Sequence, residues 1–440
     1  MMVEPVKRAI LPIYFALCLL MGGASNGGFL ENLLLQLLGL AIATSAVMQA
    51  RRHPTILTDR SSKWLAALLI AIVVIQFIPL PLAIWSELPG RTSILEELAL
   101  VDVVPALTLV TLSLHETITS AVWILPAMGF GLALALRPRP DLDWLAIALV
   151  ACAFAGIGLG LIQFSGPKDS PAYLYSFTNN GLLVGFFSNA NHMATLLLVT
   201  FPFLAAVVRF AIDAQPQRQR ELTFFAIVLA AFVLLGLGLV GSLTGYALAL
   251  PVLVMSALII FPGRRRSLVV ALVPALIAGA VLIALTEEGG NVFAKDNAFA
   301  EGGRQQIFST AWEATRHYWP VGSGLGTFRE VYDDFENASS ARPVYVNHAH
   351  NDYLEIVLEF GLLGVLAILA FAAWWVSRIL VVWRLRQAQP FARAAAIASG
   401  VILLHSAWDY PLRTAAISTV FAMCCVILAR TSEIEKRRAI

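Results

Sequence analysis

Residues 347–377 read Asn-His-Ala-His-Asn-Asp-Tyr-Leu-Glu-Ile-Val-Leu-Glu-Phe-Gly-Leu-Leu-Gly-Val-Leu-Ala-Ile-Leu-Ala-Phe-Ala-Ala-Trp-Trp-Val-Ser, a polar run followed by a long apolar one. A helix needs about 20 mainly apolar residues to cross the hydrocarbon core of a bilayer, and residues 353–377 meet that length. Asp352 and Glu355 have the spacing of a capping box, which predicts that the helix starts there. His350 and Asn351 would then lie just above the N-terminus of a membrane-spanning helix.

The same length criterion, applied along the 440 residues, predicts about twelve membrane-spanning helices. The chain is 59% hydrophobic and only 13% charged, which is far more apolar than an average soluble domain. We therefore expect an all-α polytopic membrane protein in which residues 1–440 form a single integral membrane domain. The expected spans cover approximately residues 9–25, 28–49, 64–85, 119–136, 143–164, 192–212, 222–240, 243–262, 267–286, 353–377, 392–409 and 412–429.

The distribution of lysine and arginine predicts the orientation, because these residues are retained on the cytoplasmic side. With the N-terminus inside, the predicted cytoplasmic segments hold 22 of the 30 Lys and Arg residues. Both termini are therefore predicted to be cytoplasmic. Two predicted external segments are long, residues 86–118 and residues 287–352, and the second lies between the ninth and tenth spans. Loops of that length usually carry a functional element.

Five polar clusters of the chain all fall at the predicted external side. Ionisable groups in or beside a membrane are costly, so their gathering on one face indicates a functional site there. The clusters are residues 185–192 entering the sixth span, residues 241–245 between the seventh and eighth spans, Arg304, residues 347–352, and residues 405–413 at the last corner.

The chemistry of His350 and Arg304 fits an anion site. A helix N-terminus presents free N–H groups and partial positive charge, which favour an anion nearby. Arg304 adds a permanent charge and a fork suited to phosphate. A histidine beside such a site can move a proton next to a phosphate leaving group. The alternative interpretation is that His348 and His350 simply bond to water at a helix entry.

The remaining motifs do not favour a metal-binding or a nucleotide-binding site. The run Gly322-Ser-Gly324-Leu-Gly326 lacks the preceding strand and the following Lys-Ser/Thr of a nucleotide loop, so it is interpreted as a place where the backbone approaches something closely. Asp333, Asp334 and Glu336 could bind a divalent cation, but a solvated acidic face is favoured. The four cysteines, Cys18, Cys152, Cys424 and Cys425, each sit in an apolar run and are interpreted as packing residues.

Several of these motifs together resemble the O-antigen ligase and polymerase superfamily. His350-Asn351, nine residues and then Gly361-Leu-Leu-Gly364 is similar to its His-Asn, nine-residue, Gly-x-x-Gly pattern. The resemblance covers roughly residues 140–430 and includes the twelve-span layout with one large external loop. Further similar stretches are Gly303-Arg304, Trp312, Pro320, Gly322 to Phe328, and the Gly-Phe-x-x-Asn-x-Asn-His segment around Asn189.

The resemblance implies a multi-pass protein of the bacterial inner membrane that works on the periplasmic face. It would take a glycan from undecaprenyl diphosphate and join it to a sugar hydroxyl of an acceptor glycolipid or growing polysaccharide, with no cofactor, metal or nucleic acid. The family often has Ser-Arg-Gly where this chain has Ser242-Leu-Thr244-Gly245, and external Arg413 is the candidate substitute for that arginine. The implied catalytic residues are His350 and Arg304; the substrate-binding candidates are Asn351, His348, Arg413, Asn189, Asn191, His192, Ser242 and Gly324.

Three functions remain open on the sequence. The first is an inverting lipid A–core ligase, in which His350 takes the proton of the acceptor hydroxyl as it attacks the anomeric carbon. The second is a polymerase of the same superfamily, which differs in its acceptor. The third is a transporter of lipid-linked glycans, a class in which internal repeats and charges midway through the bilayer are common. We find no convincing repeat here, and the polar clusters lie at one face.

Overall fold

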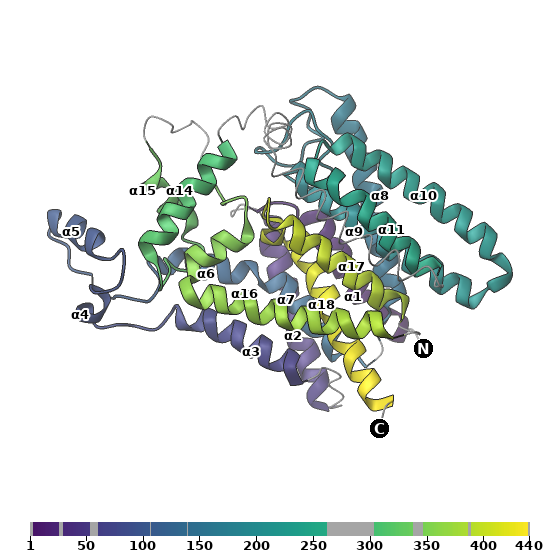
Figure 1. Ribbon diagram of the computed structural model, residues 1–440, viewed down its shortest axis with the longest axis horizontal. Coiled ribbons are helices and arrows are strands. Elements are labelled where there is room, and N and C mark those ends of the chain that lie inside the picture. Colours follow the sequence, from purple (N-terminus) through teal and green to yellow (C-terminus); the bar gives the residue numbers. More distant parts are fainter. Residues whose placement is uncertain are drawn as a thin grey trace.

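The computed structural model describes residues 3–25, 30–52, 60–105, 107–138, 140–261, 303–337, 346–385 and 389–438. Helices make up 76% of the structure, and the described residues contain no β-strand. The main helices form one elongated bundle (Figure 1). They are α1 (Val3–Met21), α2 (Leu30–Arg52), α3 (Arg60–Ile75), α6 (Leu114–Trp123), α7 (Leu125–Leu136), α8 (Leu142–Ser165), α9 (Ala190–Ala214), α10 (Gln219–Val240), α11 (Leu243–Ile260), α16 (Asp352–Arg384), α17 (Pro390–His405) and α18 (Ala415–Arg438).

Helix α9 is the centre of the bundle. It packs against α8, α10, α11 and α17, and residues 196–199 have no exposed surface. Apolar side chains occur on every side of α9, as expected of a helix buried among other helices. Its N-terminus, capped by the Asn189 side chain, is thereby fixed at one end of the bundle.

The helical, polytopic character of the membrane prediction is confirmed, whereas the count of twelve stays a prediction. Six described helices are long and apolar enough to cross a membrane, and the bent pair α6 and α7 would make a seventh. Helices α1, α17 and α18 contain shorter apolar stretches. The predicted span at residues 267–286 lies outside the described residues.

Prolines account for two differences between predicted and observed helix bounds. Helix α3 ends at Ile75, ahead of Pro79 and Pro81, rather than at residue 85. The predicted span 119–136 is broken by a bend of 40° between α6 and α7, where Pro126 follows the bend. Proline removes a helical N–H and clashes with the preceding turn, which explains both interruptions.

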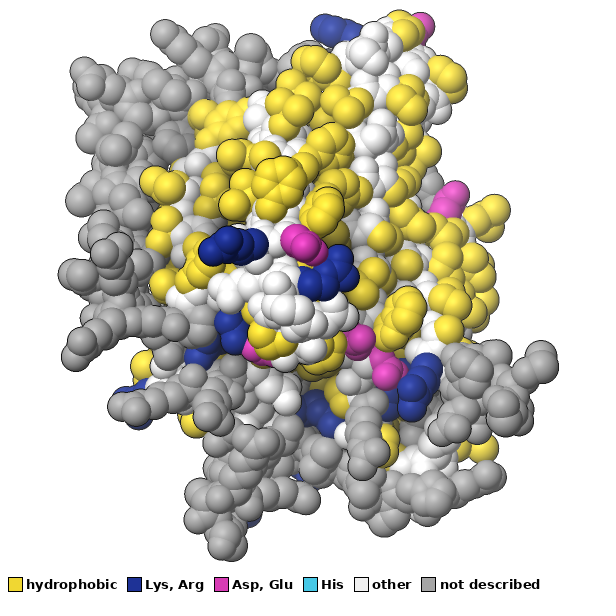
Figure 2. All heavy atoms as spheres, turned by 90° about the vertical axis from the view of Figure 1, so that its right-hand side faces the viewer, with side chains coloured by type: hydrophobic (Ala, Val, Ile, Leu, Met, Phe, Trp, Pro, Cys, Tyr) yellow, Lys and Arg dark blue, Asp and Glu magenta, His cyan; other side chains and the backbone are white. Residues whose placement is uncertain are grey.

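Described residues of the predicted loops gather in two places on the bundle. At one end, Arg430 donates to the carbonyl of Arg137 over 2.7 Å, and Arg209 donates to that of Ile260 over 3.3 Å. Figure 2 faces the right-hand side of Figure 1 and shows basic and acidic side chains gathered between apolar flanks. At the other end, residues 185–192, 346–352 and 405–413 come together. The placement of the loops on two sides of a membrane, and the orientation, stay predictions.

Short helices extend from the second end of the bundle. These are α5 (Thr92–Leu100) from the predicted segment 86–118, α4 (Leu82–Trp85) from the end of the predicted span 64–85, and α14 (Gly303–Tyr318) and α15 (Phe328–Phe335) from the segment 287–352 (Figure 1). Arg91 joins the two segments, because its buried guanidinium donates to the carbonyls of Val110 and Gly322, each over 2.9 Å.

Candidate functional site

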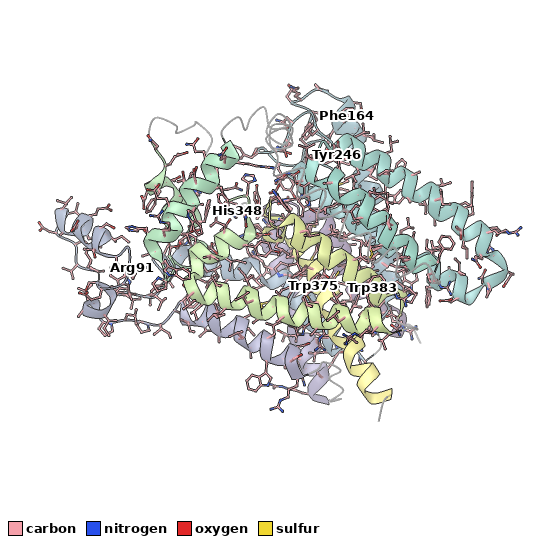
Figure 3. All side chains as sticks on the ribbon, in the orientation of Figure 1. Arg91, Phe164, Tyr246, His348, Trp375 and Trp383 are labelled. Atoms are coloured by element: carbon pink, nitrogen blue, oxygen red, sulfur yellow. The ribbon has the colours of Figure 1, made fainter. Side chains whose placement is uncertain are left out.

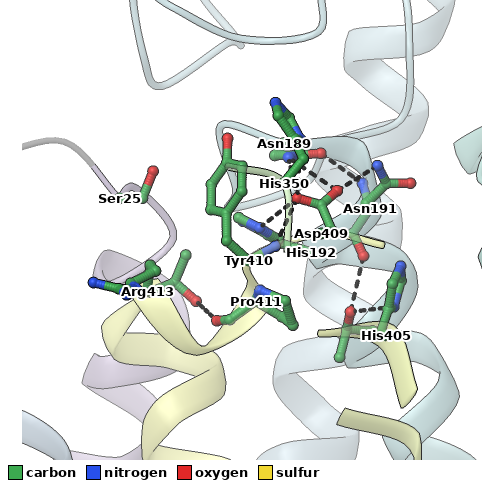
Figure 4. Close-up of polar contacts among 12 residues, drawn as sticks. Ser25, Asn189, Asn191, His192, His350, His405, Asp409, Tyr410, Pro411 and Arg413 are labelled. Carbon is green, nitrogen blue, oxygen red and sulfur yellow. Dashed lines mark hydrogen bonds and ion pairs between the residues drawn. The ribbon is translucent and has the colours of Figure 1, made fainter. Parts of the chain in front are cut away.

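Four segments that are far apart in the sequence meet at the carboxylate of Asp409. This residue lies in the corner between α17 and the 3-10 turn η2 (Pro411–Arg413). Figure 4 shows the start of α9, the His350 segment and this corner side by side. The fourth segment is the first turn of α14, which carries Arg304. The corner therefore gathers residues from three separate regions of the chain around one acidic group.

The carboxylate of Asp409 is surrounded by nitrogen atoms. Asn191 donates to Oδ2 over 2.6 Å, and the backbone N–H of Tyr410 donates to Oδ1 over 2.8 Å. His192 Nε2 and His350 Nδ1 lie 3.7 and 3.5 Å from Oδ1. A guanidinium nitrogen of Arg304 lies 3.8 Å from Oδ2. Buried carboxylates need such partners, since an unpaired buried charge is strongly unfavourable.

The environment of Asp409 favours its ionised form. Its side chain is only 1% exposed, and burial alone raises a carboxyl pKa. The His192 and His350 imidazoles outweigh burial and hold the pKa of Asp409 well below its ordinary value. The site therefore contains a fixed negative charge in direct reach of two imidazoles.

His350 has an unusual backbone and a ring that is partly open to solvent. Its φ is +51°, in the left-handed region that only a few per cent of non-glycine residues adopt. Its side chain is 24% exposed, while Nδ1 itself is buried and has no hydrogen bond within normal distance. Strained backbone of this kind concentrates at functional sites. The geometry directs Nδ1 to Asp409 and leaves the other side of the ring accessible.

The ring of Tyr410 contacts three imidazoles. Its centroid lies 5.0 Å from His192, 4.5 Å from His348 and 4.9 Å from His350. Burial, with a smaller effect of Asp409, raises the pKa of the Tyr410 hydroxyl above its ordinary value, so the phenol stays protonated near neutral pH. Tyr410 thus packs between the Asp409 cluster and the neighbouring His348.

A second charged cluster forms around Arg413. Its guanidinium lies 3.2 Å from Glu359, 3.4 Å from Glu355 and 3.6 Å from Asp352, and all three carboxylates are buried. Burial lowers the pKa of Arg413, but the three carboxylates more than compensate and raise it. His348 Nδ1 is 2.8 Å from Glu355. The cluster thus combines three carboxylates with one guanidinium.

Residues 228–369 match the O-antigen ligase family. The predicted resemblance is thereby confirmed for this segment, which contains Arg304, His350 and the Gly361 and Gly364 positions. No curated protein matches the chain. Asn189, Asp409 and Arg413 lie outside the segment with the O-antigen ligase match, yet the fold brings them against it.

Most of the predicted site residues come together. His350, Arg304, Asn191 and His192 surround Asp409, as described above, and Asn189 donates to both of its carboxylate oxygens over 3.4 Å. Asn351 is the N-cap of α16, because its side chain accepts from the N–H of Leu354 over 3.0 Å. Helix α16 begins at Asp352 as predicted, but the capping box is wrong. The side chain of Glu355 instead accepts from the N–H of Ala349 over 3.0 Å and contacts His348.

Ser242 and Gly324 lie elsewhere. Ser242 caps α11 by accepting from the N–H of Gly245 over 3.1 Å, and no described hydrogen bond joins it to the Asp409 cluster. Gly324 donates its N–H to the carbonyl of Glu359 over 2.9 Å. The glycine run therefore approaches α16, as the sequence predicted for its backbone. The described residues contain no group of three or more metal-ligating side chains, and Asp333 and Asp334 are exposed.

Sequence reasoning missed the residue at the centre of the site. The corner 405–413 was predicted to be a polar cluster, but only Arg413 was assigned a role there. Asp409 carried a usable signal, because it is an acidic residue directly beside an apolar helix, a costly position. Glu355 and Glu359 carried the same signal within a predicted span. What the sequence did not contain was the pairing of each acid with its partner.

Proposed function

We propose that this chain is a periplasmic-face glycosyltransferase of the inner membrane with both termini cytoplasmic. It transfers a glycan from undecaprenyl diphosphate to an acceptor sugar hydroxyl, with lipid A–core as the acceptor. The observation that carries this proposal is the convergence of His350 and Arg304, from separate segments, on the buried carboxylate of Asp409. The match of residues 228–369 to the O-antigen ligase family supports it.

The arrangement of Asp409 and His350 suits a general base. With Asp409 beside Nδ1, that nitrogen carries the proton and Nε2 is free to accept one, which is the usual role of a carboxylate next to a histidine. His350 Nε2 takes the proton of the acceptor hydroxyl while the hydroxyl oxygen bonds to the anomeric carbon. The bond from that carbon to the diphosphate oxygen breaks, and its electron pair leaves with the diphosphate. Displacement in one step inverts the anomeric configuration.

Arg304 is the described cation best placed for the diphosphate. Its side chain is 36% exposed and lies at the opening of the Asp409 cluster. Arg413 is less suited to phosphate, because three carboxylates already surround it. The N-terminus of α16 is also less suited, since Asn351 accepts from Leu354 and the carbonyl of Ser406 accepts from Asp352. We therefore assign the leaving diphosphate to Arg304.

The test is transfer by purified protein in nanodiscs, with undecaprenyl-diphosphate glycan as donor and lipid A–core as acceptor. We expect His350→Ala to reduce the rate by about 10²- to 10⁴-fold, the usual effect of removing a general base. Arg304→Lys should also reduce the rate, because lysine keeps the charge but loses the planar fork. Arg316→Lys, an exposed change in the same helix α14, is the matched control. Near-normal transfer by either site variant, with folding intact, would reject the role assigned to that residue.

A polymerase of the same superfamily is the second candidate, because the same site would act on another acceptor. The lipopolysaccharide of a deletion strain distinguishes the two. Loss of all long chains with accumulation of undecaprenyl-linked polymer indicates a ligase, whereas a core carrying a single repeat unit indicates a polymerase. For the transporter alternative, the expected result is no transfer by the purified wild-type protein.

A further inference from the structure

His192 is a fully buried imidazole whose two ring nitrogens have no hydrogen bond within normal distance among the described residues. Its side chain has no exposed surface and lies in the first turn of α9. The rings of Phe187 and Tyr410 pack edge-on against it, with centroids 6.3 and 5.0 Å away. A buried polar group in this state is rare and needs an explanation. A ring with no exposed surface is not placed to contact a substrate, so the explanation lies in what the ring faces inside the protein.

His192 and His350 face the same oxygen of Asp409. Nε2 of His192 is 3.7 Å from Oδ1, and Nδ1 of His350 is 3.5 Å from it (Figure 4). The backbone N–H of Tyr410 already donates to Oδ1 over 2.8 Å, and Asn189 adds a longer contact of 3.4 Å. A carboxylate oxygen offers about two acceptor positions. The two imidazoles therefore converge on the position that Tyr410 leaves, and the place of one ring depends on the place of the other.

The fold holds these two imidazoles with different firmness. His192 belongs to the central helix of the bundle, and residues 193–195 behind it have no exposed surface. His350 lies in the segment before α16, and its side chain is 24% exposed. A ring fixed by a helix can hold an acid in one orientation, and that acid can then orient a ring on a loop. Catalytic bases are commonly oriented by a further group in this way.

Two other histidines lie nearby but have different partners. His348 Nδ1 is 2.8 Å from Glu355, and Figure 3 shows this ring at the same end of the bundle as α14. His405 Nδ1 is 2.7 Å from the hydroxyl of Thr195. Neither ring has a described nitrogen within 4 Å of the Asp409 carboxylate. The meeting of two imidazoles on one oxygen is therefore specific to the start of α9 and the segment before α16.

We propose that His192 is a positioning residue for the transfer reaction: its Nε2–H holds Oδ1 of Asp409 in place and thereby sets the position of the His350 ring. The inference rests on the proposed function, in which His350 removes the proton of the acceptor hydroxyl. His192 acts through Asp409 and touches neither donor nor acceptor. The three side chains form a row that runs from the buried centre of the bundle to the open side of the His350 ring.

Three substitutions at His192 separate a positioning role from the filling of space. His192→Phe keeps a buried ring but removes the N–H that faces Asp409. His192→Gln places an amide nitrogen near the position of Nε2, whereas the shorter His192→Asn places it near Nδ1 and leaves the Nε2 position empty. The Gln and Asn pair keeps the test valid if the larger Phe impairs folding. His115→Phe, at an exposed imidazole of α6, is the matched control.

The kinetic test is a comparison of kcat with KM in the nanodisc assay. We expect His192→Phe and His192→Asn to lower kcat by about 10- to 100-fold, the factor that corresponds to a hydrogen bond to a charged group. KM for donor and acceptor should stay at the wild-type values, because the ring contacts neither. His192→Gln should retain most of kcat, and His115→Phe all of it. A rise in KM with kcat kept, or equal kcat for the Gln and Asn variants, would overturn the proposal.

The route through Asp409 is tested in the Asp409→Asn background. Residues that act as one unit show non-additive effects. His192→Phe should therefore lower kcat little further once residue 409 is neutral. The same fold-reduction in both backgrounds would mean that His192 acts independently of Asp409, and the proposal would be wrong.

A spectroscopic measurement separates failure of this inference from failure of the proposed function. Nitrogen-15 labelling of the histidine rings gives NMR signals for His350, assigned by their loss in His350→Asn, whether or not any transfer occurs. We expect these signals to shift in His192→Phe, to return to the wild-type position in His192→Gln and to stay there in His115→Phe. Unmoved His350 signals in folded His192→Phe would overturn the inference. Shifted signals without any transfer by the wild type would support the contact through Asp409 and count against the proposed function alone.

Discussion

The Nδ1 atom of His350 lies 3.5 Å from Oδ1 of Asp409, a carboxylate that is almost fully buried and belongs to a segment more than fifty residues away. Asp409 is also within 4 Å of His192 and Arg304, so a single acid holds the proposed base and the proposed phosphate ligand in one place. We therefore attribute the relative positions of His350, His192 and Arg304 to their shared contact with Asp409.

Replacing Asp409 should therefore impair catalysis more than folding. Asp409→Asn keeps the size of the side chain but removes the charge that orients His350. We expect the transfer rate to fall by about 10²- to 10⁴-fold, measured with the nanodisc assay. Asp333→Asn, at an exposed carboxylate of α15, is the control and should behave like the wild type. If Asp409→Asn transferred glycan as fast as this control, the orienting role would be wrong.

The charge of Asp409 should contribute to stability at neutral and at mildly acidic pH. The pKa of Asp409 is held well below its ordinary value, so the carboxylate stays ionised from neutral pH down to well below pH 4. Its stabilising effect is present above its ordinary pKa and is lost only as the pH falls through its lowered pKa. We expect the difference in melting temperature between the wild type and Asp409→Asn to stay level from pH 7 to pH 5. A difference that disappears between pH 7 and pH 5 would contradict the lowered pKa of Asp409.

Arg413 should matter for stability. Arg413→Gln leaves Asp352, Glu355 and Glu359 without their shared cation, and breaking a buried ion pair on one side costs about 3–5 kcal/mol. Arg413→Lys keeps the charge but reaches fewer carboxylates, so its loss should be smaller. Thermal unfolding of the purified protein measures both. A wild-type melting temperature for Arg413→Gln, with transfer alone lost, would instead favour a phosphate-binding role.

The backbone break in α16 should tolerate only glycine. Gly361 has φ +56°, and a Cβ there would clash with the carbonyl of Pro320. We expect Gly361→Ala to destabilise the protein by more than about 1 kcal/mol. Gly158→Ala, in α8 where a Cβ meets no neighbour, should stabilise it by about 0.5–1 kcal/mol. Equal stability of the two variants would show that the break is not fixed by Pro320.

The sequence predicted the helical elements well because each depends on local information. The apolar run after Asp352 is long enough to fix α16, and a polar residue before it fixes the start. Breaks were harder to predict. Pro79 and Pro81 lie in an apolar stretch, so composition alone extended the predicted span past the end of α3. The kink at Gly361 depends on how closely residues 320–322 approach, which only the tertiary structure decides.

The sequence predicted on which side of the membrane the site lies, but not which of its residues contact one another. The polar clusters were each visible in the sequence, and the predicted topology placed them on one side. Asn191 and Asp409 are 218 residues apart, however, and no local pattern indicates that they bond. The same holds for Arg413, whose charge suggested a phosphate ligand until its three carboxylate neighbours were placed around it.

The positive φ of His350 has a practical consequence for mutagenesis. Alanine at this position removes the imidazole and also carries a side chain that the left-handed conformation disfavours, so its loss of activity mixes two causes. Asparagine and glycine adopt that conformation more readily. The pair His350→Asn and His350→Gly would therefore separate the chemistry of the ring from the shape of the loop, and a designed replacement nucleophile or base at this position should be chosen first for its backbone.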